Sequence, residues 1–290
     1  MNRAAMEEDM KRICIFGAGQ AGVMVEKWLP KEYKVECYID NNSEKHNQQI
    51  NGRKILSMEE GLKLSPDVII IAILNREAVS SIKKQIKESG FKGEVEDITV
   101  FRKYQDVRLA TLRLIAQEIK DRKVKGDMAE LGVFKGDFAC VMNELFPDRD
   151  LHLFDTFEGF HEKDLIVEEQ FGTKGMEHRD FSDTNIDLVK SKMKNPEKVH
   201  FYKGYFPDTY PDHMPKLALV SLDPDLYEPV YQGLKKFYPL LSSGGVILVH
   251  DYNSMQFPGV KKAVRKYADE EGIFVIPLMD MHGTAVILKP

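Results

Sequence analysis

The chain has 290 residues, of which 43% are hydrophobic and 30% charged; this is typical of a globular protein and long enough for two domains. Its formal net charge of -5 argues against a nucleic-acid partner, which is bound by neutralising phosphates. No apolar run approaches the roughly 20 residues of a membrane-spanning helix, and the polar N-terminus does not resemble a secretory signal. Three widely spaced cysteines form no disulfide or zinc pattern. We therefore expect a cytoplasmic protein that binds neither nucleic acid nor membrane.

The first hundred residues alternate strand-like and helix-like patterns, which predicts a small parallel α/β unit. Four apolar runs are expected to be strands, at 13–16, 35–39, 68–73 and 94–100. Two helical patterns lie at 21–29 and 76–89, and they end at Pro30 and Gly90. We assign residues 1–102 to this unit, as a small Rossmann-like domain.

A helix expected at 104–122 lies in a linking segment, 103–125, where it should bridge the two units and cover the edge of the second. A second α/β series follows. Its expected strands are 127–133, 151–154, 199–203, 217–222 and 245–250, with a terminal hairpin of 273–278 and 284–289. Its expected helices are 137–145, 184–193, 228–241 and 259–271. The long segment 156–196 has the character of a lid or binding loop.

The first glycine turn has the pattern Gly17-x-Gly19-x-x-Gly22 between a strand and a helix, and Asp40 ends the next strand. This matches the dinucleotide fingerprint in its required context. The turn could bind a phosphate at the helix N-terminus, and Asp40 could bind a ribose hydroxyl. A nucleotide or nucleotide-sugar ligand and a purely structural role both remain open. No residue of the unit is an obvious catalyst of hydride transfer.

A second strand-to-helix turn carries Glu130, Gly132 and Gly136, and Asp155 lies 25 residues after Glu130 at another strand end. In a doubly wound sheet both acids would lie at the carboxyl edge, beside the topological switch point. Asp155 could bind two ribose hydroxyls, and Glu130 could orient the amino end of a ligand. Simple packing between strand and helix is the alternative for the glycines.

Three later strands also end in polar residues, at Lys203-Gly204, at Ser221 to Asp225 and at His250 to Asn253. Asp223, His250 and Asp251 could bind a divalent metal, or carboxylates and histidine could perform acid–base chemistry. The alternative is that Asp223 and Asp225 cap the following helix while His250 bonds to backbone.

Six segments resemble the macrocin and mycinamicin O-methyltransferase family, over roughly residues 105–290. They are GDMAELGVFKGDFA (126–139), LHLFDTFEGF (151–160), FSDT (181–184), GYFPDTYP (204–211), SLDPDLYEPVYQGLKKFYPLLSSGGVILVHDYN (221–253) and GVKKAV (259–264). The resemblance implies a class I methyltransferase fold for residues 126–290, with seven strands and a terminal antiparallel hairpin. It also implies S-adenosylmethionine as the methyl donor, a magnesium site and an acidic general base.

By position, the resemblance makes Asp223 a metal ligand and Asp225 the base. His250-Asp251 matches a pair of acidic ligands, and His250 replaces the first acid, so a different divalent ion or another role for His250 is open. The residues predicted to bind the cofactor are Glu130, Gly132, Gly136, Asp155, Thr156, Gly204 and Asp223. The first unit, over about 11–100, looks like small Rossmann-like domains found ahead of sugar-modifying enzymes of surface polysaccharide pathways.

These observations predict an O-methyltransferase that acts on a hydroxyl of a sugar or glycosylated metabolite (a small-molecule or glycan acceptor), with Asp225 and His250 in catalysis and with a divalent metal. One alternative is a nucleotide- or NAD-dependent sugar oxidoreductase or epimerase that uses the first unit. The other is a non-catalytic protein that binds the cofactor. Exposed aromatic residues would also suit a homo-oligomer.

Overall fold

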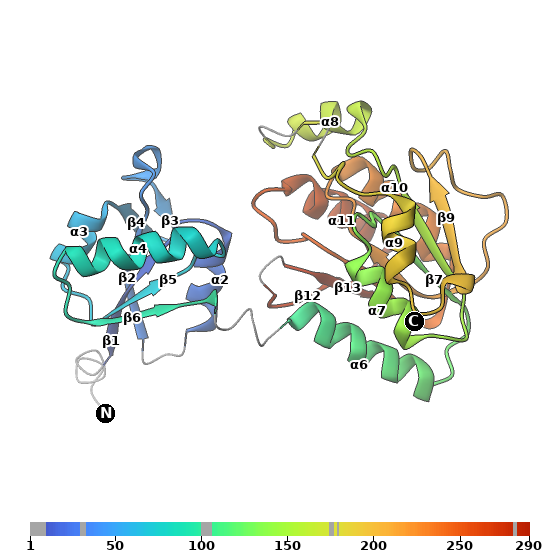
Figure 1. Ribbon diagram of the computed structural model, residues 1–290, viewed down its shortest axis with the longest axis horizontal. Helices are drawn as coiled ribbons and strands as arrows, with labels where there is room; N and C mark the ends of the chain where they lie inside the picture. The colour runs from blue at the N-terminus through green and yellow to red at the C-terminus, as the bar shows by residue number, and fades with distance from the viewer. Residues whose placement is uncertain (1–9, 30–32, 100–105, 174–176, 179, 281–282) are drawn as a thin grey trace. The chain divides into compact units, whose positions relative to one another are not determined.

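The computed structural model describes residues 10–29, 33–99, 106–173, 177–178, 180–280 and 283–290. The chain forms two compact units, residues 1–106 and 107–290 (Figure 1). No helix in these described ranges is long and apolar enough to cross a membrane.

The first unit is a six-stranded sheet in the order β3-β4-β2-β1-β5-β6. Its strands are β1 (Lys11–Phe16), β2 (Tyr33–Ile39), β3 (Gln49–Ile50), β4 (Arg53–Leu56), β5 (Val68–Ile71) and β6 (Glu94–Asp97). Its helices are α2 (Gln20–Trp28), α3 (Met58–Lys63) and α4 (Arg76–Glu88). The expectation of a purely parallel unit is wrong, because β3 pairs antiparallel with β4. These two short strands flank the polar turn Asn51-Gly52 and have too few apolar residues to show a strand period.

The second unit is a seven-stranded sheet in the order β12-β13-β11-β10-β7-β8-β9. Its strands are β7 (Asp127–Leu131), β8 (Leu151–Asp155), β9 (Val199–Lys203), β10 (Leu217–Leu222), β11 (Leu241–Val249), β12 (Ile276–Pro277) and β13 (Ala285–Leu288). The strands β7 to β11 are parallel, whereas β13 runs antiparallel to β11 and β12 antiparallel to β13. The predicted seven strands and terminal antiparallel hairpin are thus confirmed.

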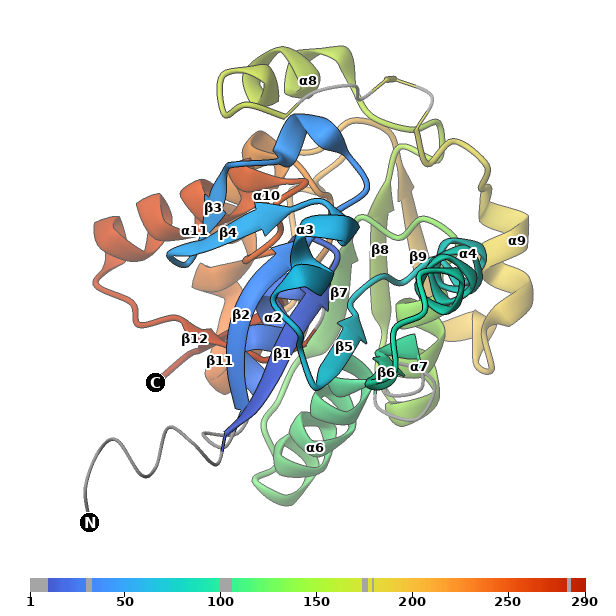
Figure 2. The same ribbon diagram turned by 90° about the vertical axis from the view of Figure 1, so that its left-hand side faces the viewer.

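Helices cover both faces of the second sheet (Figure 2). One core contains buried side chains of α10 (Tyr227–Phe237) and α11 (Pro258–Glu271). The other contains those of α6 (Val107–Asp121), α7 (Asp137–Leu145) and α9 (Ile186–Lys192). The strands between them read as continuous apolar runs because both of their faces are buried.

Helix α6 covers a face of the second sheet rather than its edge, which corrects the sequence-based expectation. Its buried residues Leu112, Ala116 and Ile119 pack in one cluster with Met128 of β7 and Leu248 of β11. Their spacing of four and three residues places them on one stripe of the helix. That stripe needs a broad apolar surface, which the sheet face provides.

A short helix, α8 (Glu162–Glu169), interrupts the long segment expected to be a lid or binding loop. Its two buried residues are both acidic, Asp164 and Glu168. The helix lies above α10 and α11 in Figure 1. Its buried face is polar, so the sequence has no apolar period from which to predict it.

Candidate functional site

Four of the residues predicted for metal binding or catalysis lie together in the second unit. Asp223, Asp225, His250 and Asp251 each offer one possible ligand atom, and these atoms lie within 4.8 Å of one another. The Nδ1 atom of His250 is 2.7 Å from Oδ1 of Asp223 and 2.8 Å from Oδ2 of Asp251. They meet because β10 and β11 are neighbouring parallel strands whose carboxyl ends share one edge. We call these four residues the acidic cluster.

The backbone of the acidic cluster has an unusual conformation at two positions. Asp225 and Asp251 have φ angles of 60° and 54°, in the left-handed region that non-glycine residues rarely adopt. Neither Asp223 nor Asp225 is the N-cap of α10, which is Leu226. The helix-capping alternative therefore does not account for these carboxylates, and the backbone strain is typical of functional sites.

The sequence interpretation missed one member of this site, Arg108 of α6. Its Nη1 is 3.0 Å from Oδ2 of Asp223, its Nη2 is 3.4 Å from Oγ of Ser221, and its guanidinium lies 4.0 Å from the ring centroid of Phe138. Arg108 precedes Leu112 by four residues and so shares its buried stripe. The sequence did contain a signal for this residue, an arginine on the apolar stripe of a helix. A buried charge needs a partner, so this position indicated an ion pair.

The charges of the acidic cluster are strongly coupled. Burial tends to raise the pKa of Asp223, but Arg108 and His250 outweigh it and lower the pKa to about 2. Burial tends to lower the pKa of His250, but Asp223 and Asp251 raise it to about 10. Burial, together with the carboxylates of Asp223 and Asp251, holds the pKa of Asp225 well above its usual range. Additional positive charge near Asp225 would favour its ionised form.

The acidic cluster fits a divalent cation by the chemistry of its donors. Three carboxylates supply the hard oxygen ligands that suit Mg²⁺ or Mn²⁺, whereas the imidazole of His250 suits transition metals better. In this structure Nδ1 of the imidazole lies within ion-pair distance of both Asp223 and Asp251. Because these carboxylates raise the pKa of His250 to about 10, a second role is open to it, as a positive charge shared by the two carboxylates.

The predicted cofactor-binding acid Asp155 is engaged with the backbone of its own unit. Its Oδ2 accepts hydrogen bonds from the N–H groups of Val133 (2.6 Å) and Phe134 (2.9 Å), and its Oδ1 accepts one from Phe157 (2.6 Å). Phe134 and Phe157 have φ angles of 48° and 53°, so both loops bend sharply there. Asp155 therefore fastens the turn after β7 to the loop after β8.

The glycines of the turn after β7 are explained by packing within the unit. A Cβ atom on Gly132, whose φ is +81°, would lie 2.3 Å from the carbonyl oxygen of Asp223. A Cβ atom on Gly136 would lie 2.7 Å from Cγ1 of Val189. Gly132 thus lets the turn after β7 touch the loop that carries the acidic cluster, and a role in binding the cofactor stays a prediction.

Glu130 of β7 has an unpartnered atom that a cofactor could use. The side chain is 1% exposed, and its Oε2 has no hydrogen-bond partner among the described residues. Burial raises the pKa of Glu130 to about 8, against the opposing charge of Arg108. A buried oxygen without a partner is costly, so a ligand ammonium group at this position would be stabilised.

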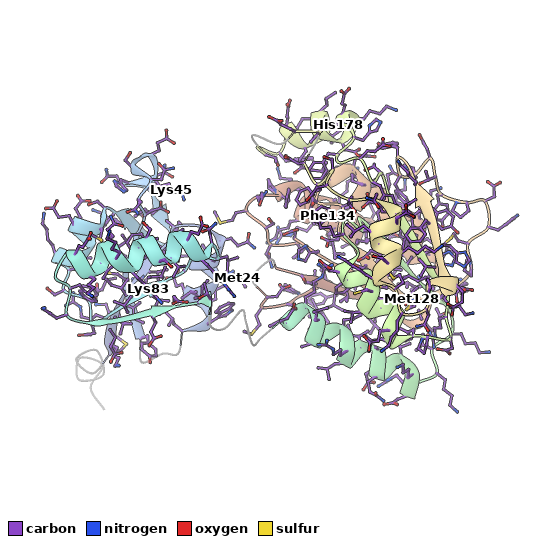
Figure 3. The ribbon with its side chains drawn as sticks, in the orientation of Figure 1. Met24, Lys45, Lys83, Met128, Phe134 and His178 are labelled. Atoms are coloured by element: carbon purple, nitrogen blue, oxygen red, sulfur yellow. The ribbon has the colours of Figure 1, made fainter. Side chains whose placement is uncertain are left out.

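A cleft of about 300 Å³ lies at the carboxyl ends of β8 and β9. It is lined by residues 156, 158–161, 178 and 203–205. Thr156 and Gly204, both predicted to bind the cofactor, are among them, whereas Glu130, Gly132 and Gly136 are not. His178, labelled in Figure 3, comes from the segment that follows α8.

In the first unit the glycine turn is also held by an acid. Oδ2 of Asp40 accepts hydrogen bonds from the N–H of Ala18 and from Nζ of Lys45, both at 3.0 Å (Figure 3 labels Lys45). A Cβ atom would lie 2.8 Å from Ala72 O at Gly17 and 2.1 Å from Gly17 O at Gly22, but would meet nothing within 4 Å at Gly19. Gly17 and Gly22 therefore serve packing, Gly19 is open to a ligand, and nucleotide binding stays a prediction.

The strand order of the second unit, with its antiparallel terminal hairpin, defines it as a class I methyltransferase fold. The solved O-methyltransferase NovP is similar, with a TM-score of 0.52 and 25% identity, over 63% of this chain and 79% of NovP. The calicheamicin methyltransferase CalS11 has the same fold, with a TM-score of 0.53 and 21% identity, over 66% of this chain and 82% of CalS11.

The model of the macrocin O-methyltransferase (TylF) family matches residues 65–289, and the chain belongs to that family. Residues 9–94 match a different family, described as C2185-like, N-terminal. The family match confirms the resemblance found in the sequence and places the chain among methyltransferases.

Two curated relatives are similar to this chain over a little more than half of its length. The demethyldecarbamoylnovobiocin O-methyltransferase of Streptomyces niveus is 31% identical over 173 residues, which are 55% of this chain and 64% of that protein. The mycinamicin III 3''-O-methyltransferase of Micromonospora griseorubida is 27% identical over 180 residues, which are 57% of this chain and 69% of that protein. The chain thus spans less than two thirds of the first relative's length.

Proposed function

We propose that this protein transfers a methyl group from S-adenosylmethionine to a hydroxyl of a sugar or glycosylated metabolite. The observation that carries the proposal is the acidic cluster at the carboxyl edge of a class I methyltransferase sheet. The family and the names of its relatives support the reaction class, since both relatives are O-methyltransferases and the second is named for mycinamicin III.

The cofactor site we propose lies along β7, β8 and β9. The unpartnered Oε2 of Glu130 would accept a hydrogen bond from the ammonium group of the donor. The cleft with Thr156 and Gly204 would hold its adenosine end. Asp155 holds the two loops between these points, and so keeps the site in shape. When bound, S-adenosylmethionine supplies a methyl group already activated by its sulfonium, so the protein mainly supplies proximity and orientation.

In our proposal the acidic cluster prepares the acceptor hydroxyl. Asp225 accepts the hydroxyl proton at its carboxylate as the oxygen forms its bond to the methyl carbon, while the methyl–sulfur bond of the donor breaks and S-adenosylhomocysteine leaves. Asp223, Asp251 and His250 are the residues that would hold a divalent cation, which when bound lowers the pKa of a neighbouring hydroxyl. Arg108 keeps Asp223 ionised and in place. Positive charge next to Asp225 favours its ionised form, which the base requires.

The test is the pair Asp225→Asn and Asp208→Asn, the latter an exposed aspartate outside the acidic cluster. Release of S-adenosylhomocysteine is measured with a panel of glycosides and nucleotide-sugars, with and without Mg²⁺ or Mn²⁺. We expect Asp225→Asn to abolish turnover while calorimetry shows unchanged binding of S-adenosylhomocysteine. Wild-type turnover in Asp225→Asn would exclude its role as the base, and no product from wild type with any acceptor would favour a protein that only binds the cofactor.

The alternative of a sugar oxidoreductase or epimerase run by the first unit is not favoured. Asp40, the residue that would bind a ribose, is already paired with Ala18 and Lys45. Tight NAD binding that is lost in Gly19→Val would revive that alternative, because Gly19 is the glycine of the turn whose Cβ position is open.

A further inference from the structure

Glu168 of α8 is a buried carboxylate that binds two helices at once. The side chain is 1% exposed. Its Oε2 accepts a hydrogen bond from the N–H of Tyr227 at 2.8 Å, and its Oε1 accepts one from the N–H of Gly259 at 3.1 Å. Oε1 also accepts a hydrogen bond from the hydroxyl of Thr173 at 2.9 Å. Both oxygens of the carboxylate are therefore occupied by donors from three segments.

The two backbone donors lie at the N-termini of α10 and α11. The N-cap residues of these helices, Leu226 and Phe257, have no side-chain capping hydrogen bond. The free N–H groups of a helix N-terminus need an acceptor, and the helix dipole favours a negative charge there. Glu168 supplies both from a third helix, so a single side chain caps two helices that are distant from it in sequence.

These helices directly follow the two loops that carry the acidic cluster. Tyr227 is two residues after Asp225, and Gly259 is eight residues after Asp251. The loop after β10 and the loop after β11 are thus fixed to one carboxylate. A displacement of Glu168 would act on both loops, and therefore on the distance between Asp225 and Asp251.

The chain leaves space for this contact at Gly259. A Cβ atom at that position would lie 2.2 Å from Oε2 of Glu168. Gly259 lies in the first turn of α11, where alanine would otherwise be the better helix former. The glycine therefore matches the close approach of the carboxylate rather than the needs of the helix.

Other contacts join α8 and the residues just after it to the same two helices. The ring centroid of Phe171, just after α8, lies 4.6 Å from that of Tyr227, and Nζ of Lys262 lies 4.4 Å from the centroid of Phe171. At the other end of the helix, the hydroxyl of Tyr205 donates to Oδ1 of Asp164 at 3.0 Å. Tyr205 follows β9 and lines the cleft, so α8 and the residues just after it contact the loop after β9 and the N-terminal turns of α10 and α11.

We propose that Glu168 is a positioning residue that sets the separation of the loops bearing Asp225 and Asp251, and so couples the docking of α8 to the geometry of the acidic cluster. The inference rests on the proposed function, because it assigns the reaction to that cluster. Small misplacements of reacting groups can cost about 100-fold in rate. Loss of Glu168 should therefore lower kcat by about that factor. It should leave the affinity for S-adenosylhomocysteine unchanged, because Glu168 contacts neither Glu130 nor Asp155, and because Tyr205 of the cleft is bonded to Asp164 rather than to Glu168.

The experiment is a double-mutant cycle of Glu168→Ala and Gly259→Ala, with Glu169→Ala, an exposed neighbour, as the control. Each single substitution should lower kcat, because Gly259→Ala displaces the carboxylate. In the Glu168→Ala background the methyl group of Gly259→Ala has room, so the second substitution should add no further loss. Glu168→Gln, which keeps the shape of the side chain, should show an intermediate kcat. All rates are measured well below the melting temperature of each variant.

Three results would overturn the proposal. One is a kcat of Glu168→Ala within twofold of wild type. If the melting temperature were lowered at the same time, the role of Glu168 would be purely structural. Another is an equal effect of Gly259→Ala in both backgrounds. If wild type shows no methyl transfer, amide exchange decides: faster exchange at residues 223–227 and 251–259 in Glu168→Ala supports the positioning role, and unchanged exchange overturns it.

Discussion

Asp155→Asn is a nearly isosteric change that separates two roles of this carboxylate, fastening loops and binding a ribose. The amide keeps one acceptor oxygen, which can still serve the N–H groups of Val133 and Phe134. In the wild type, Oδ1 of Asp155 accepts a hydrogen bond from the N–H of Phe157 at 2.6 Å. In the variant the NH₂ group takes the place of Oδ1, so two donors face each other. One hydrogen bond is lost outright, and the other two become neutral.

The expected loss follows from these three bonds. A hydrogen bond to a charged group contributes about 1.5–3 kcal/mol, and a neutral one about 0.5–1.5 kcal/mol. At the low ends of both ranges the sum of the changes is about 3.5 kcal/mol, which corresponds to a few hundred-fold in an opening equilibrium. Amide exchange at residues 133, 134 and 157 should therefore accelerate by about that factor in the free protein. Affinity for S-adenosylhomocysteine should fall with it.

The control is Asp150→Asn, just before the opposite end of β8, where Asp150 lies 3.5 Å from Nε2 of His200. It should leave exchange at residues 133, 134 and 157 unchanged. The reasoning is refuted if Asp155→Asn loses affinity for S-adenosylhomocysteine while exchange at those amides stays at the wild-type rate. In that case the carboxylate would bind the ligand directly, as the sequence predicts.

Two further substitutions test the electrostatics of the second unit. Arg108→Met leaves Asp223 without its guanidinium partner and should cost about 2–4 kcal/mol of unfolding free energy, since both side chains are mostly buried. Unfolding in guanidinium chloride should show that Arg108→Met lowers the unfolding free energy much less in the Asp223→Asn background. An equal decrease in both backgrounds would contradict the pairing of Arg108 with Asp223. Burial raises the pKa of Asp164 to about 6, although a hydrogen bond from Tyr205 opposes this. Because this value lies above that of the unfolded chain, Asp164 costs stability as the pH rises from about 4 through 6. Asp164→Asn should match wild type near pH 4 and exceed it by up to about 3 kcal/mol at pH 8, whereas an equal difference at both pH values would disprove the assignment.

The acidic cluster could be predicted from the sequence because it depends on one rule. Apolar runs at 217–222 and 245–250 ended in Asp223 and His250-Asp251, and parallel neighbouring strands bring their carboxyl ends to one edge. The local pattern of each strand was thus enough to predict that residues distant in sequence lie close together in the fold. The strand β9, the strand β10 and the helix α7 also have the predicted bounds, since each is a short element bounded by turn residues.

The features that could not be predicted from the sequence depend on contacts between distant segments. Helix α8 buries Asp164 and Glu168, so its buried face looks like a solvated one until its partners are known. Arg108 meets Asp223 across 115 residues of sequence. The hydrogen bonds of Asp155 depend on how two loops fold back, which no residue spacing reveals.

The turn after β7 carries its own anion, and this limits which ligands suit it. Where such a turn binds a dinucleotide, its N–H groups are turned toward a pyrophosphate. Here the N–H groups of Val133 and Phe134 already bond to the carboxylate of Asp155. A phosphate at that point would be repelled by the carboxylate and would find those donors occupied. The charge of Asp155 therefore disfavours any ligand that places a phosphate group at this turn.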